Sequence, residues 1–262
     1  MTGAFAVVIP ARHGSTRLPG KPLLDIGGRP MIQHVWNRAM ESGADEVVVA
    51  TDDPRIAEAC TGFGASVAMT SSGHQSGTDR IAEVALARDW VEDEIIVNVQ
   101  GDEPLLPHAL VGQVAELLHF NPDAGMATLG TAVQGLDEYL DPNVVKFVAR
   151  ADGTALYFSR APIPWHRDGA ASGLTSQVRW QGAMRHLGLY AYRARHLHEI
   201  AAASPCTLEE DERLEQLRAL WLGIPIQTDV ARALPGPGVD TPEDLERVRQ
   251  LLSRAGPGGS SP

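Results

Sequence analysis

The sequence predicts an α/β protein, a three-layer sandwich in which helices cover both faces of a mostly parallel, mixed β-sheet. Short apolar runs without polar alternation, typical of strands buried on both faces, occur at 4–9, 47–50 and 95–99. Segments with helical spacing and one apolar face lie between them. Strands that alternate with helices in this way form a parallel sheet with helices on both sides.

The first half of the chain supplies most of this alternation. Pro30 suits the first turn of a helix and Gly43 suits the position after its end. Ser76 is expected to cap a later helix, with Asp79 completing a capping box. The further expected elements are a helix near 54–61, a short strand at 66–69 and a helix opened by Pro107.

From about residue 128 the pattern changes to β segments without long helices between them. These segments are expected at 126–133, 144–149, 154–158 and 186–192. We interpret about 128–195 as an inserted subregion of a single domain that spans 1–254. The rest of the domain is expected to be a helix at 204–222, a strand at 224–230 and a helix capped by Thr241. A disordered tail is expected at 255–262.

The loop after the first strand, IPARHGSTRLPGKP at 9–22, combines small residues with cations. Its small residues are Gly14, Ser15 and Gly20, and its cations are Arg12, Arg17 and Lys21. Backbone N–H groups of such a loop can turn inward around an anion. Arginine adds planar forks for phosphate and lysine adds a mobile point charge. The loop therefore predicts a polyphosphate site.

Two common phosphate-binding motifs do not fit this loop. In a P-loop four residues separate the glycines, whereas five separate Gly14 from Gly20, and Pro22 stands where Ser or Thr would hold magnesium. No G-x-G-x-x-G follows any expected strand, so a dinucleotide-binding domain is not indicated.

Three expected strands end in polar segments, namely the cationic loop, residues 51–53 and residues 100–102. In parallel sheets ligands bind outside the carboxyl ends of the strands, so these segments should meet. Asp102 follows a buried strand and Asp240 precedes the cap of the last helix. Two such carboxylates suit Mg²⁺, which takes one or two carboxylates plus phosphate oxygens. Each aspartate alone would also fit a turn or a helix start.

Composition narrows the class of protein. The 262 residues carry a formal net charge of −11, which argues against binding to nucleic acid or to an anionic membrane. The two cysteines, Cys60 and Cys206, lack C-x-x-C spacing and indicate a reducing compartment without a zinc site. No apolar run reaches membrane-spanning length and no signal pattern opens the chain. We therefore expect a cytoplasmic protein.

The segment PARHGSTRLPGKPL at 10–23 resembles the N-terminal signature of the 3-deoxy-manno-octulosonate (KDO) cytidylyltransferases, the CMP-KDO synthetases. These enzymes belong to the wider sugar nucleotidyltransferase group. Further blocks resemble the family in the same order, so the resemblance spans nearly the whole chain. They are ATD at 50–52, HQSGTDR at 74–80, VNVQGDEP at 97–104, ALYFSRAPIPW at 155–165, RHLGLYAYR at 185–193, LEQLR at 214–218 and PGPGVDTPEDLERVR at 235–249.

The resemblance implies a nucleotide-diphospho-sugar transferase fold, Rossmann-like and glycosyltransferase-A-like. It implies transfer of CMP from CTP to KDO with release of pyrophosphate, which activates KDO for lipopolysaccharide biosynthesis. It also implies a homodimer. The implied catalytic residues are Lys21, Arg12, Arg17, Asp102 and Asp240, with Mg²⁺ held by Asp102 and Asp240.

The resemblance also divides the binding residues between the two substrates. Those implied for the nucleotide are Arg12, Gly14, Ser15, Lys21, Ser76, Arg80 and Gln100. Those implied for the sugar are Gln100, Arg160, Arg185, His186, Tyr190, Glu215 and Gln216.

Other functions stay open from the sequence. The acceptor could be another sugar acid, such as a sialic acid or an amino analogue of KDO. A more distant alternative uses a hexose 1-phosphate and another nucleotide. A non-catalytic nucleotide-sugar sensor on the same fold is the alternative from a different class. The presence of Lys21, Asp102 and Asp240 counts against the sensor.

Overall fold

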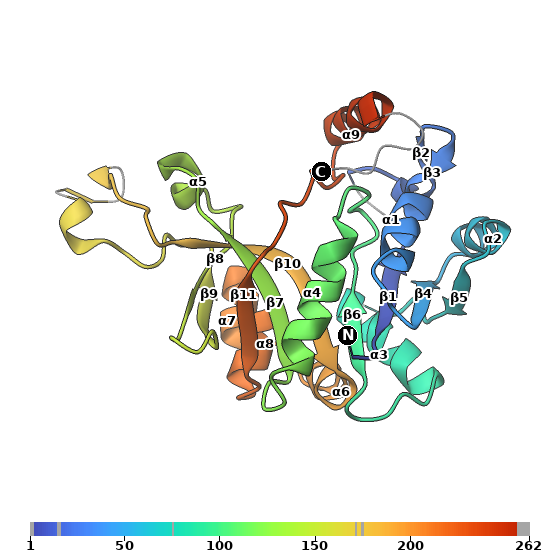
Figure 1. Cartoon of the computed structure of the whole chain (residues 1–262), viewed down its shortest axis with the longest axis horizontal. Helices are drawn as coiled ribbons and strands as arrows, with labels where there is room; N and C mark the ends of the chain where they lie inside the picture. Colours follow the sequence, from blue (N-terminus) through green and yellow to red (C-terminus); the bar gives the residue numbers. More distant parts are fainter. Residues whose placement is uncertain (1–2, 15–16, 75, 171, 174–175, 256–262) are drawn as a thin grey trace.

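The computed structural model describes residues 3–14, 17–74, 76–170, 172–173 and 176–255. These residues form a nine-stranded sheet whose main path runs β11-β7-β10-β6-β1-β4-β5 (Figure 1). The strands on this path are β1 (Ala6–Ala11), β4 (Glu46–Thr51), β5 (Ser66–Met69), β6 (Ile95–Asn98), β7 (Met126–Ala132), β10 (Met184–Arg193) and β11 (Ile226–Val230). Two more strands, β8 (Lys146–Ala149) and β9 (Ala155–Ser159), extend it beside β10.

Only β10 runs against its neighbours on the main path, where it pairs antiparallel with β6 and β7. The other pairings on that path are parallel. The predicted α/β class with a mostly parallel, mixed sheet is therefore confirmed. A small hairpin of β2 (Asp25–Ile26) and β3 (Arg29–Pro30) lies apart from this sheet.

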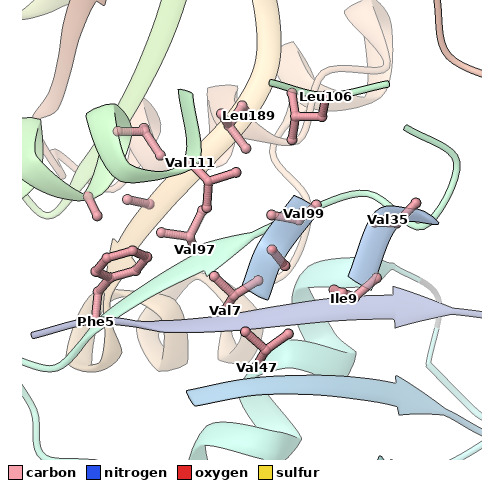
Figure 2. Packing of buried hydrophobic residues seen from close by; sticks show 14 of the residues in the cluster. Phe5, Val7, Ile9, Val35, Val47, Val97, Val99, Leu106, Val111 and Leu189 are labelled. Carbon is pink, nitrogen blue, oxygen red and sulfur yellow. The ribbon is translucent and has the colours of Figure 1, made fainter. Parts of the chain in front are cut away.

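Helices pack on both faces of the sheet. The face that carries Val7 and Ile9 of β1 packs against α1 (Met31–Met40), α2 (Pro54–Gly62) and α4 (His108–His119). Figure 2 shows this cluster, in which Phe5 and Val7 lie near Val97, and Ile9 lies beside Val35 of α1. The opposite face packs against α3 (Gly77–Ala87), α6 (Ala194–Ala202) and α8 (Gln216–Trp221).

The apolar runs form buried strands because they lack polar alternation, as predicted. Val7, Val8 and Ile9 have no exposed surface, and Val8 belongs to the cluster on the opposite face from its two neighbours. The last helix, α9 (Pro242–Ala255), starts as expected. The Asp244 N–H donates to Thr241 Oγ1 and the Thr241 N–H donates to Asp244 Oδ2, at 3.2 and 3.0 Å. Within the described residues, no helix is both long and apolar enough to cross a membrane.

The prediction of one helix over 204–222 is wrong. The segment forms α7 (Thr207–Glu212) and α8, separated by Arg213 in the left-handed conformation with φ 54°. The break has a physical cause outside the segment, because Arg160 binds the exposed Glu212 carbonyl at 2.6 Å through Nε. Two helices, α5 (Leu136–Leu140) and α6, were not expected from the sequence.

The subregion between β7 and β10 extends away from the sheet at one end of the molecule (Figure 1). Besides β8 and β9 it contains α5 and the 3-10 turn η2 (Arg167–Gly169). A small apolar cluster of Val133, Tyr139 and Ala183 holds its base. The expected tail at 255–262 lies outside the described residues except for Ala255, the last residue of α9. The single-domain interpretation stays a prediction.

Candidate active site

A cleft of about 560 Å³ lies at the carboxyl ends of β1 and β6. It brings together most residues predicted for the nucleotide, its phosphates and the metal. These are Arg12, Gly14, Arg17, Lys21, Ser76, Arg80, Gln100, Asp102 and Asp240. Ser15, also predicted here, lies outside the described residues. The three polar segments thus converge at one edge of the sheet, as the topology requires.

The cationic loop closes on itself before Lys21. The Gly20 N–H donates to the His13 carbonyl at 3.1 Å, and Gly20 adopts a φ of 69°, a left-handed value that a residue with a Cβ rarely takes. The 3-10 turn η1 (Lys21–Leu23) begins at the next residue. The loop closure therefore directs the Lys21 side chain across the cleft.

Lys21 lies between the two aspartates predicted to bind metal. Its Nζ is 2.7 Å from Asp102 Oδ2 and 3.1 Å from Asp240 Oδ1. The backbone joins the two loops, because the Val239 N–H donates to the Asp102 carbonyl at 2.9 Å. Arg17 also approaches Asp240, at 3.5 Å, with a side chain 66% exposed. Residues 138 positions apart in sequence, Asp102 and Asp240, thus share one cation.

This pair of carboxylates fits a hard cation. Two carboxylate groups that converge on one ammonium provide the oxygen donors that Mg²⁺ prefers, and phosphate and water normally supply the rest. In the described part of the chain, no group of three or more His, Cys, Asp or Glu side chains is placed to hold a metal alone. The donor set therefore suits a cation that binds together with a phosphorylated ligand.

A glycine allows β1 and β6 to lie close together at the cleft. A Cβ added to Gly101 would lie 2.9 Å from the Pro10 carbonyl, which real Cβ atoms avoid. Gly101 therefore permits a close backbone approach that any other residue would oppose. As a result Gln100 and Asp102 lie directly beside the start of the cationic loop.

The first turn of α3 forms another wall of the cleft. Ser76 Oγ accepts from the Asp79 N–H and the Asp79 carboxylate accepts from the Ser76 N–H, which confirms the predicted capping box. Arg80 is only 4% exposed and lies 3.4 Å from Asp52 of the second polar segment. Its guanidinium also donates to the Thr70 hydroxyl. Arg80 is thus fixed before any ligand arrives.

Residues predicted for the sugar form a second group beside this wall. Tyr190 of β10 pairs with Asn98 of β6, two positions before Gln100. The His186 ring lies 5.2 Å from the Tyr190 ring. Burial lowers the pKa of His186 to about 3, so its imidazole is neutral at pH 7. Glu215 and Gln216 line a small cavity together with Tyr190.

Two residues predicted for the sugar have protein partners instead of facing the cleft. Arg160 donates to the carbonyls of Glu212 and Pro142, at 2.6 and 3.0 Å. Arg185 forms an ion pair with Glu138 at 3.0 Å, and its side chain is 47% exposed. Of the residues predicted for the sugar, Gln100 lines the cleft, whereas Arg160, Arg185, His186, Tyr190, Glu215 and Gln216 do not. Arg185 does interact electrostatically with Glu103, which is next to Asp102.

Glu103, next to Asp102, is a residue beside the site that the sequence analysis missed. Burial, together with the charges of Asp102 and Asp240 and against that of Arg185, raises its pKa to about 7. The block VNVQGDEP contained Glu103, but a carboxylate beside another carboxylate in a turn is ordinarily solvated. Only the fold showed that protein surrounds it.

Known proteins to which this chain is similar in sequence are described as cytidylyltransferases. A family model described as cytidylyltransferase matches residues 6–226. The chain is 56% identical over 249 residues to the 3-deoxy-manno-octulosonate cytidylyltransferase of Thioalkalivibrio sulfidiphilus, which covers 95% of this chain and 99% of that protein. It is 53% identical over 252 residues to the protein of the same name from Pseudomonas syringae pv. syringae, with 96% and 99% covered.

Solved structures agree with these relatives. A CMP:2-keto-3-deoxy-manno-octonic acid synthetase complexed with CTP is 44% identical, with a TM-score of 0.86 over 96% of this chain and 99% of that one. A 4-diphosphocytidyl-2C-methyl-D-erythritol synthase shares the fold at 17% identity, with a TM-score of 0.62 over 95% and 98% of the two chains. The predicted fold class and the predicted family resemblance are confirmed.

Proposed function

Because the chain belongs to the cytidylyltransferase family, we propose that it transfers CMP from CTP to KDO and releases pyrophosphate. The observation that carries this proposal is the cleft in which Lys21 meets Asp102 and Asp240 within 3.1 Å. A site of this kind suits a substrate with several phosphates. Relatives with more than half of their residues identical, over nearly the full length, carry the name of this activity. The activation of KDO for lipopolysaccharide biosynthesis follows from the same activity.

In this reaction the protein mainly has to position the two substrates and neutralise negative charge. The anomeric hydroxyl of KDO attacks the α-phosphorus of CTP, and the bond to pyrophosphate breaks. Negative charge then grows on the leaving group, which Lys21, Arg12 and Arg17 are arranged to stabilise. Arg80 and Ser76 hold the nucleotide side of the cleft. Fixing both substrates in one orientation removes much of the entropic cost of the reaction.

Asp102 and Asp240 are the residues that would hold Mg²⁺ in this reaction. Their fit is supported by the shared cation at 2.7 and 3.1 Å and by the hard oxygen character of both donors. When bound, Mg²⁺ supplies neutralisation of phosphate charge. Lys21 must then release at least one carboxylate, and its flexible stem allows the ammonium to move toward phosphate.

The sugar acid is proposed to bind beside the first turn of α3. His186, Tyr190, Glu215 and Gln216 supply neutral and acidic polar groups suited to sugar hydroxyls, and Gln100 lies between the two substrates. Arg185 is proposed to bind the sugar carboxylate after exchanging its exposed partner, Glu138. Arg160 is proposed to contribute by holding the start of α8, which follows Glu215.

We also propose a homodimer and a cytoplasmic location. The projecting subregion exposes apolar side chains, with Trp165 42% and Val178 65% exposed, which suits burial against a second copy. Both cysteines, Cys60 and Cys206, are unpaired and buried, which suits a reducing compartment. Measuring the mass of the particle in solution tests the first of these proposals.

CTP is expected to be strongly preferred over ATP and GTP, because a pocket shaped to a pyrimidine excludes the larger purine. The experiment measures pyrophosphate release with each nucleotide and a panel of acceptors that includes KDO, a sialic acid and an amino analogue of KDO. Equal turnover of ATP and CTP would point to a broader nucleotidyltransferase. No pyrophosphate with any pair would favour the non-catalytic sensor.

Arg185→Ala is expected to raise KM for KDO about tenfold and to leave KM for CTP nearly unchanged, because it removes a ground-state contact to one substrate. Arg185→Lys should recover only part of the loss if the contact is two-pronged. Arg150→Ala, which removes an exposed cation of the same subregion, is the control. A changed constant for CTP alone would show that the two ends of the site are assigned wrongly. No change in either constant would make Arg185 a surface cation.

A further inference from the structure

A buried hydrogen bond links the first turn of α3, beside the cleft, with Glu215. Its donor is Thr78, which is 1% exposed and follows the cleft residue Gly77 in α3. The Thr78 hydroxyl donates to Glu215 Oε2 at 2.8 Å. Both residues line one small cavity together with Tyr192 of β10. The bond therefore joins α3 to the residue at the start of α8.

Thr78 is the donor and Glu215 the acceptor of this bond. Thr78 has a single hydroxyl proton, so it can donate to no second group while the bond is made. The two partners lie 137 positions apart in the sequence. The bond thus fixes the Glu215 side chain against a helix from a distant part of the chain.

The same arrangement leaves one oxygen of Glu215 unused. Glu215 Oε2 accepts from Thr78. Glu215 Oε1 is buried and has no partner among the described residues, and the same holds for Gln216 Nε2. Buried polar atoms are rarely left unpaired in native proteins, so an acceptor and a donor are held ready for a ligand or water.

The void beside these two atoms is small. The cavity that Glu215, Gln216, Tyr190 and Thr78 line has a volume of about 10 Å³, close to the minimum for one water molecule. A hydroxyl group of a bound substrate can replace such a water with the same hydrogen bonds. An adjacent acceptor and donor match a hydroxyl, which is both.

We infer that Thr78 is a positioning residue for the second substrate, fixing Glu215 so that Oε1 receives a hydroxyl of the sugar acid. This inference rests on the proposed function. Thr78 itself touches neither substrate. It lies in the helix turn that Ser76 caps at the nucleotide cleft, so one turn of α3 organises both binding sites. Without the Thr78 donor, the Glu215 carboxylate loses the contact that fixes its rotamer.

The test is steady-state kinetics of Thr78→Val, which keeps the shape and removes the donor. KM for KDO is expected to rise about tenfold, as for a lost hydrogen bond to a charged group, while KM for CTP stays within about twofold. Thr78→Ser restores the hydroxyl and should recover most of the affinity for KDO. Thr228→Val is the matched control, because Thr228 is 7% exposed and donates only to a backbone carbonyl, that of Gly153.

A double-mutant cycle with Glu215→Gln separates positioning from general destabilisation. If Thr78 acts through Glu215, Thr78→Val should add little in the Glu215→Gln background. Should Thr78→Val fail to fold, Thr78→Ala removes the same donor with a smaller side chain and is expected to raise KM for KDO by a similar factor. Unchanged constants, or equal increases for CTP and KDO, would overturn the inference while leaving the proposed function standing. A wild-type protein that releases no pyrophosphate from CTP and KDO would overturn both.

Discussion

Asp102→Asn and Asp240→Asn are each expected to reduce turnover almost to background while the protein stays folded. The two carboxylates converge on one cation, with Lys21 Nζ at 2.7 and 3.1 Å, so neither is a spare donor. An amide keeps the shape but removes the negative charge that a hard divalent cation needs. Asp102 and Asp240 are 34% and 52% exposed as side chains, so the change should cost little stability.

The measurement is pyrophosphate release over a range of Mg²⁺ concentrations. Each variant should need far more Mg²⁺ for any activity, and EDTA should abolish turnover of the wild type. Glu243→Gln is the control, because Glu243 is an exposed acid in the first turn of α9, three positions from Asp240. Near wild-type turnover by either aspartate variant at modest Mg²⁺ would rule out a site built from both residues.

The sequence predicted the sheet well because strands that are buried on both faces consist of uninterrupted apolar residues. Residues 6–9 and 47–50 are apolar without interruption since both faces of β1 and β4 are covered. The convergence at the cleft also followed from the sequence, because the carboxyl ends of parallel strands meet at one edge. The position of Asp240 beside Asp102 was harder to predict, because it depends on a backbone hydrogen bond from Val239 to Asp102, which lie far apart in the sequence.

What the sequence did not reveal depends on contacts between distant segments. The break at Arg213 arises where Arg160, more than 50 positions away, takes the carbonyls that a continuous helix would use. A helix-like composition at 204–222 contains no trace of that partner. Arg160 was placed at the sugar only through the family resemblance, and nothing in the sequence indicated its backbone partners. The hydrogen bond from Thr78 to Glu215 joins residues 137 positions apart and has no periodic signature in the sequence.

Lys21→Ala is expected to lower turnover because it removes a positive charge that stabilises the leaving pyrophosphate. Its side chain is 13% exposed, which makes Lys21 the least exposed of the three cations of the first loop; Arg17 is 66% exposed and Arg12 is also exposed. A positive charge held in a water-poor site stabilises the leaving pyrophosphate more strongly than a solvated one does. We expect kcat with CTP to fall on the order of 10²-fold, as for other lost electrostatic contacts of this kind.

The Mg²⁺ concentration that each variant needs distinguishes Lys21→Ala from Asp102→Asn and Asp240→Asn. In the structure Lys21 Nζ occupies the place between the two carboxylates that a metal ion would also need. Removing it relieves that competition, so Lys21→Ala should need no more Mg²⁺ than the wild type although kcat is low. Lys21→Arg keeps the charge on a bulkier planar group and should recover only part of kcat. If Lys21→Ala instead kept its kcat, or recovered it fully at high Mg²⁺, then Lys21 would serve only to neutralise the two aspartates before the substrates bind.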